Sequence, residues 1–223
     1  MQPSPAAFEE AYEEIARAGE SAVVITISSK LSGTCQSAQI AAEGYDNIYV
    51  VDSQHAANGA GILAEYAILC AEKGMAAPEL AAHLKEKRNE ICVIGVLDTL
   101  EYLKKGGRIS KTVAFAGGVL NIKPVVTIED GRVALIGKAR GSRQGNNLLV
   151  KKIQEAGGVD FTMPILLGYT GLDDRLMQQY IQDSRELWQD GTERLDSVCI
   201  GSVIGTYAGP GAVVAAFFRK GGK

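Results

Sequence analysis

The sequence predicts an α/β protein of two domains, in which a mainly parallel sheet flanked by helices precedes a mixed-sheet α/β domain. Two observations favour this arrangement. Short apolar runs alternate with helical stretches in the first 89 residues, which is typical of a parallel sheet covered on both faces. Further along, an Asp-Gly pair separates two apolar runs and indicates a hairpin of antiparallel strands. With 223 residues, of which 46% are apolar, the chain can bury a substantial core.

Residues 1–89 are expected to form the N-terminal α/β domain. Apolar residues recur at helical spacing near the start, where Pro5 suits the first turn of a helix. Two short apolar runs predict strands at 22–27 and 47–51. Helices are expected around these strands, at 34–43, at 60–71 and at 78–88.

Residues 90–223 are expected to form the C-terminal mixed α/β domain. Its first apolar run predicts a strand at 91–97, and a helical region with a break at Gly106-Gly107 follows at 98–120. The hairpin around Asp130-Gly131 comes next. The remaining pattern predicts hairpin strands at 122–128 and 132–139, a helix at 142–156, a strand at 163–169, a helix at 172–188, and strands at 196–204 and 212–218.

Composition and charge argue against several classes of protein. The formal net charge is −3, whereas nucleic-acid-binding proteins are usually basic, so no nucleic-acid partner is expected. No apolar stretch reaches the roughly 18 residues that a membrane helix needs, so no integral membrane segment is expected. The first residues lack the basic region and apolar core of a secretion signal. These features favour a cytoplasmic protein.

Few side chains suit catalysis or metal binding. The four cysteines are scattered, and the chain has only two histidines, so neither a metal site nor a catalytic triad is expected. Cys35 begins a predicted helix, where the dipole can lower a thiol pKa, but a structural role is favoured. The glycines of the segment 58–64 lie too far behind the preceding strand for a dinucleotide fingerprint, and no P-loop pattern occurs. We therefore expect no catalytic residue and no cofactor.

The most informative segment is the loop Ser28–Thr34, which follows the first predicted strand and leads into a helix. Its hydroxyl groups, backbone N–H groups and the positive end of the helix dipole surround one point. Such an arrangement suits a carboxylate or a phosphate. A plain strand-to-helix turn with Ser32 as the N-cap explains the same residues, and the two interpretations are compatible.

Three further segments allow both a structural and a functional interpretation. The loop Gly205–Gly211 lies between two predicted strands and suits either a tight turn or the close approach of a ligand. Arg140 ends a predicted strand and is typical of a solvated surface charge. The basic residues Lys104, Lys105, Arg108 and Lys111 form either a solvated face or a patch that steers an anion or an acidic partner.

Several separated motifs, in this order, resemble those of the DegV family of bacterial fatty-acid-binding proteins. The resemblance runs from Gln2 to Phe218 and begins with the loop Ser28–Thr34 and the residues Gln36-Ser37-Ala38 after it. The other matching segments are Val51-Asp52-Ser53, the stretch from Leu100 to Ser110, Leu120-Asn121-Ile122-Lys123-Pro124 and the stretch from Gly205 to Gly211.

The resemblance implies a binding protein that performs no chemistry itself. In this family the tail of a long-chain fatty acid lies in a cavity between the two domains, and a separate fatty acid kinase receives the carboxylate. The implied carboxylate ligands on this chain are hydroxyl groups of the Ser-rich loop, with Tyr207 in the later glycine-rich loop: Ser29, Ser28, Ser32, Thr34 and Tyr207. Arg140 matches an arginine that the family links to the carrier function.

Two departures from the family pattern affect these expectations. The family usually begins with a further strand and a segment that supplies a threonine ligand, and only Gln2-Pro3-Ser4 resembles its end. We therefore expect an N-terminal domain that is truncated relative to the family, with one carboxylate ligand fewer. Many relatives have histidine at the position of Tyr207. A tyrosine can still donate a hydrogen bond there but stays uncharged near neutral pH.

Two alternative functions remain open from the sequence. The family's first domain is related in fold to dihydroxyacetone kinase domains, which allows a small-molecule transferase or hydrolase. A degraded family member that has lost lipid binding is the other alternative. Bound lipid in the purified protein would separate the carrier from the degraded member, and turnover without added kinase would identify an enzyme.

Overall fold

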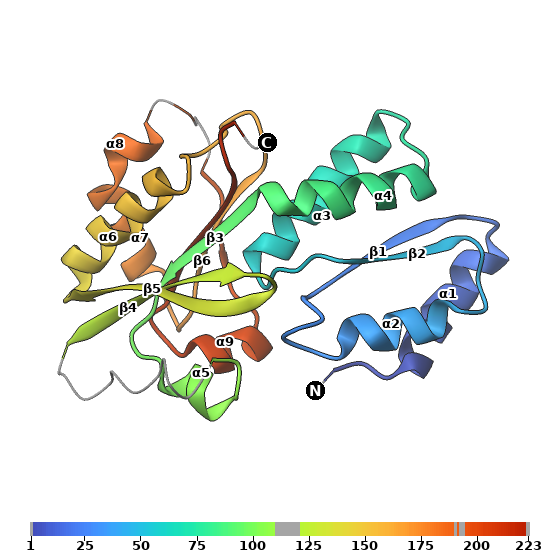
Figure 1. Cartoon of the computed structure of the whole chain (residues 1–223), viewed down its shortest axis with the longest axis horizontal. Coiled ribbons are helices and arrows are strands. Elements are labelled where there is room, and N and C mark those ends of the chain that lie inside the picture. Colours follow the sequence, from blue (N-terminus) through green and yellow to red (C-terminus); the bar gives the residue numbers. More distant parts are fainter. Residues whose placement is uncertain (1, 110–120, 190, 192–194, 222–223) are drawn as a thin grey trace.

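The computed structural model describes residues 2–109, 121–189, 191 and 195–221 and confirms the predicted α/β class (Figure 1). These described residues form two sheets, one of two strands and one of six. In chain order the elements are α1 Pro5–Arg17, β1 Ala22–Thr26, α2 Thr34–Ala42, β2 Ile48–Asp52, α3 Asn58–Glu72, α4 Ala77–Lys87, the 3₁₀ helix η1 Arg88–Glu90, β3 Ile91–Val96, α5 Glu101–Lys105, β4 Ile122–Glu129, β5 Arg132–Arg140, α6 Ser142–Glu155, β6 Ile165–Tyr169, α7 Arg175–Asp183, α8 Arg185–Trp188, β7 Ser197–Cys199, α9 Ser202–Ala208 and β8 Val213–Phe218.

The first sheet consists of β1 and β2, which pair in parallel from Ala22 opposite Ile48 to Thr26 opposite Asp52. Figure 1 shows α1 and α2 on one side of these strands and α3 and α4 on the other. A small core under α1 centres on Tyr12, which is 2% exposed. Both faces of the strands are therefore covered by helices, as a parallel sheet requires.

The second sheet has the strand order β5-β4-β3-β8-β6-β7, and only β6 and β7 pair in parallel. Helices α6 and α7 pack on one face and α3 packs on the other. All six residues of the central strand β8 are buried, and alternate residues join the cores on the two faces. The sheet is mixed, as the sequence predicts.

The β4–β5 hairpin forms at the predicted place. Asp130 and Gly131 have φ values of 47° and 74°, as a tight two-residue turn requires. A register shift between Val125 and Val126 adds an irregularity to β4. In Figure 1 the tip of the hairpin reaches from the second sheet towards the start of α2.

Helix α3 connects the two sheets through packing. Its buried residues Ile62 and Leu63 belong to one core with Val51 of β2 and with Val214 and Phe218 of β8. The chain passes from the first sheet to the second through η1, close to the predicted boundary at residue 89. Because the core continues across this point, the division into domains 1–89 and 90–223 stays a prediction.

Three predicted elements differ from the structure. The strand expected at 196–204 ends at Cys199, and the residues from Ser202 form α9 instead. Within the region expected to be helical at 98–120, α5 ends at Lys105, and residues 110–120 lie outside the described part. The helix expected at 172–188 is divided into α7 and α8 at Ser184.

Among the described residues, no helix combines the length and the hydrophobicity needed to cross a membrane.

Candidate functional site

An apolar cavity of about 470 Å³ lies between the carboxyl ends of β1 and β2 and one face of the six-stranded sheet. We call it the apolar cavity. The loops that follow β1 and β2 contribute one wall, and strands β3, β4 and β8 contribute another. Its apolar lining includes Ile27, Leu31, Ala56, Ala57, Val93, Leu97, Val126, Ile128, Val133 and Val214. Ligands commonly bind at the carboxyl ends of parallel strands, and this cavity has the size of a typical small-molecule site.

Helix α9 supplies a third wall of the apolar cavity. The residues that it contributes are spaced one and four apart, so they lie on one face of the helix: Val203, Ile204, Tyr207 and Ala208. Val203 remains 58% exposed, which places it at the mouth of the cavity. The sequence interpretation of this segment as strand and loop is wrong because the strand stops before Gly201, and the helical spacing begins only after it.

The hydroxyl groups of Ser32 and Thr34 form a polar pair in the wall of the apolar cavity. Their oxygens are 2.8 Å apart, and the backbone N–H of Thr34 donates to Ser32 Oγ at 3.3 Å. One hydroxyl donates to the other, so the second O–H is free to donate to a ligand. Thr34 is also the first residue of α2, whose N-terminal N–H groups and dipole favour a negative charge.

The helix cap differs from the sequence interpretation. Gly33, not Ser32, is the N-cap of α2, and it has no side chain with which to cap the helix. The side chain of Gln2 takes the space beside it, because a Cβ on Gly33 would lie 2.3 Å from Gln2 Oε1. Ser32 therefore does not act as the expected N-cap, and its hydroxyl pairs with Thr34 in the cavity wall.

Arg108 is the only charged residue among the described residues that line the apolar cavity. Its Nε donates to the carbonyl of Leu31 at 3.2 Å, and its Nη1 donates to the carbonyl of Gly106 at 2.7 Å. Its guanidinium also lies 5.1 Å from the ring centre of Tyr207, within the range of a cation–π contact. The described residues offer it no carboxylate partner.

Helix α5 packs closely against α9 through two tyrosines that lie on two glycines. A Cβ on Gly106 would lie 2.3 Å from the ring of Tyr207, and a Cβ on Gly209 would lie equally close to the ring of Tyr102. Gly209 also has a φ of 74°, which favours glycine. The Gly-Gly break and the later glycine-rich segment thus position Tyr207 and Arg108 beside the cavity.

Ser28 has a different role from that of the other hydroxyls in its loop. It is fully buried, and its Oγ donates to the carbonyl of Gly131 at 2.7 Å and accepts from the N–H of Lys30 at 3.2 Å. A Cβ on Gly131 would lie 2.5 Å from Ser28 Oγ. The hairpin turn therefore lies so close to Ser28 that only glycine fits at position 131. Ser28 connects the loop to the β4–β5 hairpin and is not among the residues that line the cavity.

The structure does not bring Ser29 or Arg140 to the apolar cavity. Ser29 is exposed, and its N–H donates to the carboxylate of Asp52 at 3.2 and 3.3 Å. Arg140 is exposed at the end of β5, opposite Ile122, and neither residue is among those that line the cavity. Their predicted contacts with a head group or a kinase stay predictions.

Cys35 follows Thr34 but is only 1% exposed. Burial raises the pKa of its thiol, with a smaller contribution from the charge of Asp52, while Thr26 and Arg88 oppose the shift. The thiol is thus a core side chain and not an activated nucleophile.

The arrangement can hold a molecule with one negative charge and a long apolar body. Ser32, Thr34 and Tyr207 were predicted from the sequence, and the structure brings them to one cavity. Arg108 was recognised only as part of a basic patch, because its spacing to Lys104 and Lys105 resembles a solvated helical face. Only the packing of Tyr207 on Gly106, a contact between distant segments, shows that Arg108 lies beside the cavity.

Comparison with known proteins identifies a family for this chain. The family model described as "Uncharacterised protein, DegV family" matches residues 1–220. A DegV domain-containing protein of Caldanaerobacter subterraneus is 33% identical, over 98% of this chain and 78% of the relative.

Solved structures with bound lipid share the fold. A fatty-acid-binding DegV family protein from Thermus thermophilus is 32% identical, with a TM-score of 0.85 over 97% of this chain and 78% of that one. The fatty acid kinase (Fak) B3 protein of Streptococcus pneumoniae, loaded with linoleic acid, is 25% identical, with a TM-score of 0.83 over 98% of this chain and 77% of that one. The first of these proteins is named for fatty acid binding, and the second is described as loaded with a fatty acid.

Proposed function

This chain belongs to the DegV family, and we propose that it binds a long-chain fatty acid, with the acyl tail in the apolar cavity and the carboxylate at its polar residues. The observation that carries the proposal is an apolar cavity whose described lining contains one cation and a pair of hydroxyls. A fatty acid has the matching pattern of one charge and a long hydrocarbon chain.

The acyl tail supplies most of the binding free energy in this proposal. Each methylene that leaves water for the apolar lining contributes about 0.8 kcal/mol. The tail runs among the side chains of β3, β4, β8 and α9 that line the cavity. Since a hydrocarbon chain makes no hydrogen bonds, these walls recognise its shape and length only.

The carboxylate is assigned to Arg108, Ser32, Thr34 and Tyr207. A buried carboxylate is very unfavourable unless several donors or a cation accompany it. The guanidinium of Arg108 supplies the cation, and the free hydroxyl of the Ser32–Thr34 pair and the phenol of Tyr207 supply neutral donors. Because Arg108 already stacks on Tyr207, the positive charge does not require a histidine at position 207.

The other predicted residues of the Ser-rich loop receive supporting roles. Ser28 holds the β4–β5 hairpin, which forms a wall of the cavity, and the N–H of Ser29 holds the loop to Asp52. We propose that these contacts keep Ser32 and Thr34 in place for the carboxylate. This assignment narrows the predicted set of direct ligands.

We further propose that the protein presents the fatty acid to a separate kinase in the cytoplasm. The similarity to the S. pneumoniae fatty acid kinase (Fak) B3 protein supports this role. Arg140 is the proposed contact with the kinase, because it is exposed and pairs with no carboxylate among the described residues. Presentation requires that the carboxylate, and not the tail, faces the mouth of the cavity.

Native mass spectrometry of the purified chain, followed by lipid identification after denaturation, tests the proposal. We expect a bound fatty acid that is lost or strongly reduced in a Ser32→Ala, Thr34→Val double variant. Ser21→Ala is the matched control, because Ser21 is exposed and does not line the cavity. A folded protein that contains no lipid and takes up none from a fatty acid solution would contradict the proposal.

A further inference from the structure

A second hollow, which we call the polar cleft, shares the β4–β5 hairpin with the apolar cavity but differs in chemistry. Its volume is about 580 Å³. Its walls come from the loop after β2, from η1, from the turn of the hairpin, from α6 and from the end of β8, and its floor includes Ile91, Ile94 and Ile136. None of the carboxylate ligands proposed above lines it.

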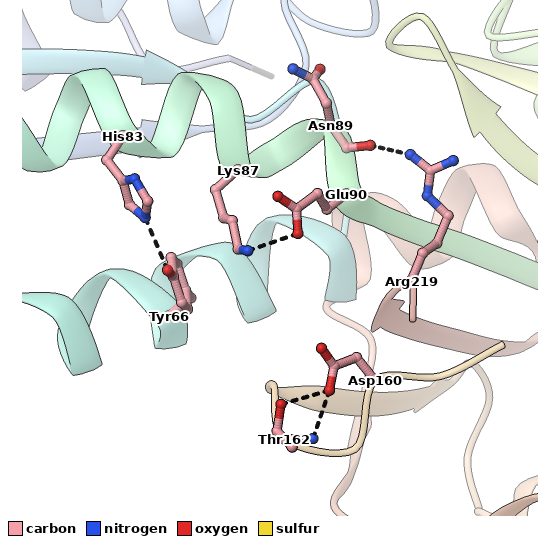
Figure 2. A network of polar contacts seen from close by, with 8 residues as sticks. All are labelled: Tyr66, His83, Lys87, Asn89, Glu90, Asp160, Thr162 and Arg219. Carbon is pink, nitrogen blue, oxygen red and sulfur yellow. Dashed lines mark hydrogen bonds and ion pairs between the residues drawn. The ribbon is translucent and has the colours of Figure 1, made fainter. Parts of the chain in front are cut away.

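Two arginines line the polar cleft without a carboxylate partner among the described residues. Arg88 of η1 donates from Nη1 to the carbonyl of Asp52, and Arg219 at the end of β8 donates from Nη2 to the carbonyl of Asn89 (Figure 2). Backbone carbonyls position these guanidinium groups but do not neutralise them. The Nε–H of Arg88 is in addition buried and has no acceptor in the described part of the chain.

His55 supplies the complementary group. Its ring is almost completely buried, with 6% of the residue exposed, and its Nε2 lies 3.1 Å from the carbonyl of Arg88. A carbonyl only accepts hydrogen bonds, so Nε2 carries the proton and Nδ1 presents a lone pair. Nδ1 has no partner among the described residues. Two residues that line the cleft thus carry a donor and an acceptor that are both buried and unsatisfied.

Acidic side chains also line the cleft, but they do not pair with these arginines. Glu155 is bound to Lys152 at 2.6 Å and to Lys151 at 3.7 Å. Glu129 and Asp130 are exposed at the hairpin turn, a different wall of the cleft. The carboxylate of Asp52 accepts from the backbone N–H groups of Ser29 and Gln54. The side formed by η1 and the end of β8 therefore keeps its positive charge.

We propose that the polar cleft binds a phosphate monoester, with Arg88 and Arg219 as charge partners of the phosphate and Nδ1 of His55 as acceptor of its P–OH proton. Guanidinium groups match phosphate oxygens in geometry and charge. An ionised carboxylate has no proton to give to Nδ1, whereas a monoester near its second pKa of about 6 has one. The isoleucine floor favours a monoester that carries an apolar or aromatic body over inorganic phosphate.

Binding involves a small adjustment of the protein. Nδ1 of His55 and Nε of Arg88 are covered by neighbouring atoms, so the phosphate reaches them when the Arg88 side chain turns towards the cleft. Arg219 is exposed and contacts the phosphate first. This order makes Arg219 the better position for mutation, because Arg88 also connects η1 to β2.

Nuclear magnetic resonance titration of the full chain tests the proposal with phenyl phosphate, phenyl sulfate and inorganic phosphate as probes. Phenyl phosphate should shift the Nε–H signals of Arg88 and Arg219 and the ring signals of His55 in a saturable manner. Phenyl sulfate has the same body but no proton, and it should bind at least about tenfold more weakly, as should inorganic phosphate. Arg219→Gln should weaken phenyl phosphate binding at least about tenfold, the scale of one charge-assisted hydrogen bond.

Arg175→Gln is the matched control, because Arg175 is an exposed arginine that pairs with Asp173 outside the cleft. Equal weakening by Arg175→Gln and Arg219→Gln would show general charge screening and overturn the proposal. Equal binding of phenyl phosphate and phenyl sulfate would overturn the role of His55 and the assignment to monoesters. The absence of saturable shifts at Arg219 would overturn the site itself.

Discussion

The apolar cavity and the polar cleft share the β4–β5 hairpin as a wall, but they differ in how many charged side chains line them. The described lining of the apolar cavity contains one charged side chain, Arg108, among mostly apolar neighbours. The polar cleft contains Arg88, Arg219 and Lys152 together with three carboxylates. In the apolar cavity, the charge of Arg108 therefore selects the ligand. In the polar cleft, selection depends on which charged side chains already have a partner of opposite charge.

This difference shows that the number of charges is a poor guide to what a hollow binds. Arg108 is exposed, so solvent screens part of its charge, and its attraction for a carboxylate grows as the ligand excludes water from the apolar walls beside it. In the cleft, Glu155 is already paired with lysines, and only the arginines remain available. Four experiments on fatty acid binding and on stability test this contrast.

Removal of the Arg108 charge, the one charge in the described lining of the apolar cavity, should have the largest effect. Arg108→Gln should weaken binding of a long-chain fatty acid about 10- to 100-fold, because a charge-assisted hydrogen bond contributes about 1.5–3 kcal/mol. Fluorescence displacement or calorimetry with the fatty acid and with the corresponding fatty alcohol would measure it. The alcohol, which has no charge, should bind the variant and the wild type equally.

Arg140→Gln is the control for this change, because it removes the same charge from an exposed residue that does not line the cavity. Its fatty acid affinity should stay within twofold of the wild type. An equal loss of acid and alcohol binding in Arg108→Gln would show that Arg108 acts by packing on Tyr207 and not by its charge.

Disruption of the shared wall should affect the stability of the whole fold. Ser28→Ala leaves the carbonyl of Gly131 and the N–H of Lys30 without their buried partner, which should lower the free energy of unfolding by about 1–3 kcal/mol. Urea denaturation would measure it. Ser29→Ala, at an exposed hydroxyl in the same loop, should change stability by less than about 0.5 kcal/mol. Similar losses in the two variants would refute the role of Ser28 as the connection to the hairpin.

Much of this architecture follows from local sequence patterns. The Asp130-Gly131 turn predicts the hairpin because both residues must adopt positive φ. The loop from Ser28 to Thr34 likewise predicts a polar site at the start of α2, and the structure places Ser32 and Thr34 in the cavity wall. In both cases the decisive contacts lie within a few residues of each other.

Long-range contacts explain what the sequence could not predict. The partner of Ser28 is 103 residues away, so no local pattern distinguishes its hydroxyl from that of Ser32. Arg108 belongs to the site because Tyr207 packs on Gly106, again from a distant segment. The segment after Cys199 was misassigned because its apolar residues suit a strand, and only their position against the sheet selects α9.

The length of the acyl chain offers a smaller, graded test of the apolar walls. Shortening a saturated ligand by two methylenes should weaken binding by about 1.6 kcal/mol, or about 15-fold, as long as the longer chain is fully buried. Calorimetry with a series of fatty acids would reveal this slope. An affinity that does not depend on chain length would refute burial of the tail.

The smallest expected effect is the dependence of stability on pH through His55 of the polar cleft. Burial, the largest cause, and the charges of Arg88 and Arg219 lower the pKa of His55, while its bond to the carbonyl of Arg88 and the charge of Asp52 oppose the shift. The unfolded chain therefore binds a proton near pH 6.5 that the folded chain does not. Stability should fall as the pH drops below about 6.5, by at most about 1.4 kcal/mol per pH unit from this group.

Urea denaturation at pH 7.5 and pH 5.5 would measure this dependence in the wild type and in His55→Gln. The variant cannot take up the proton, so its stability should change less between the two pH values, even if it is less stable at both. An identical pH dependence in the two proteins would mean that His55 titrates alike in the folded and unfolded chains, and that the charges of the polar cleft do not act on it.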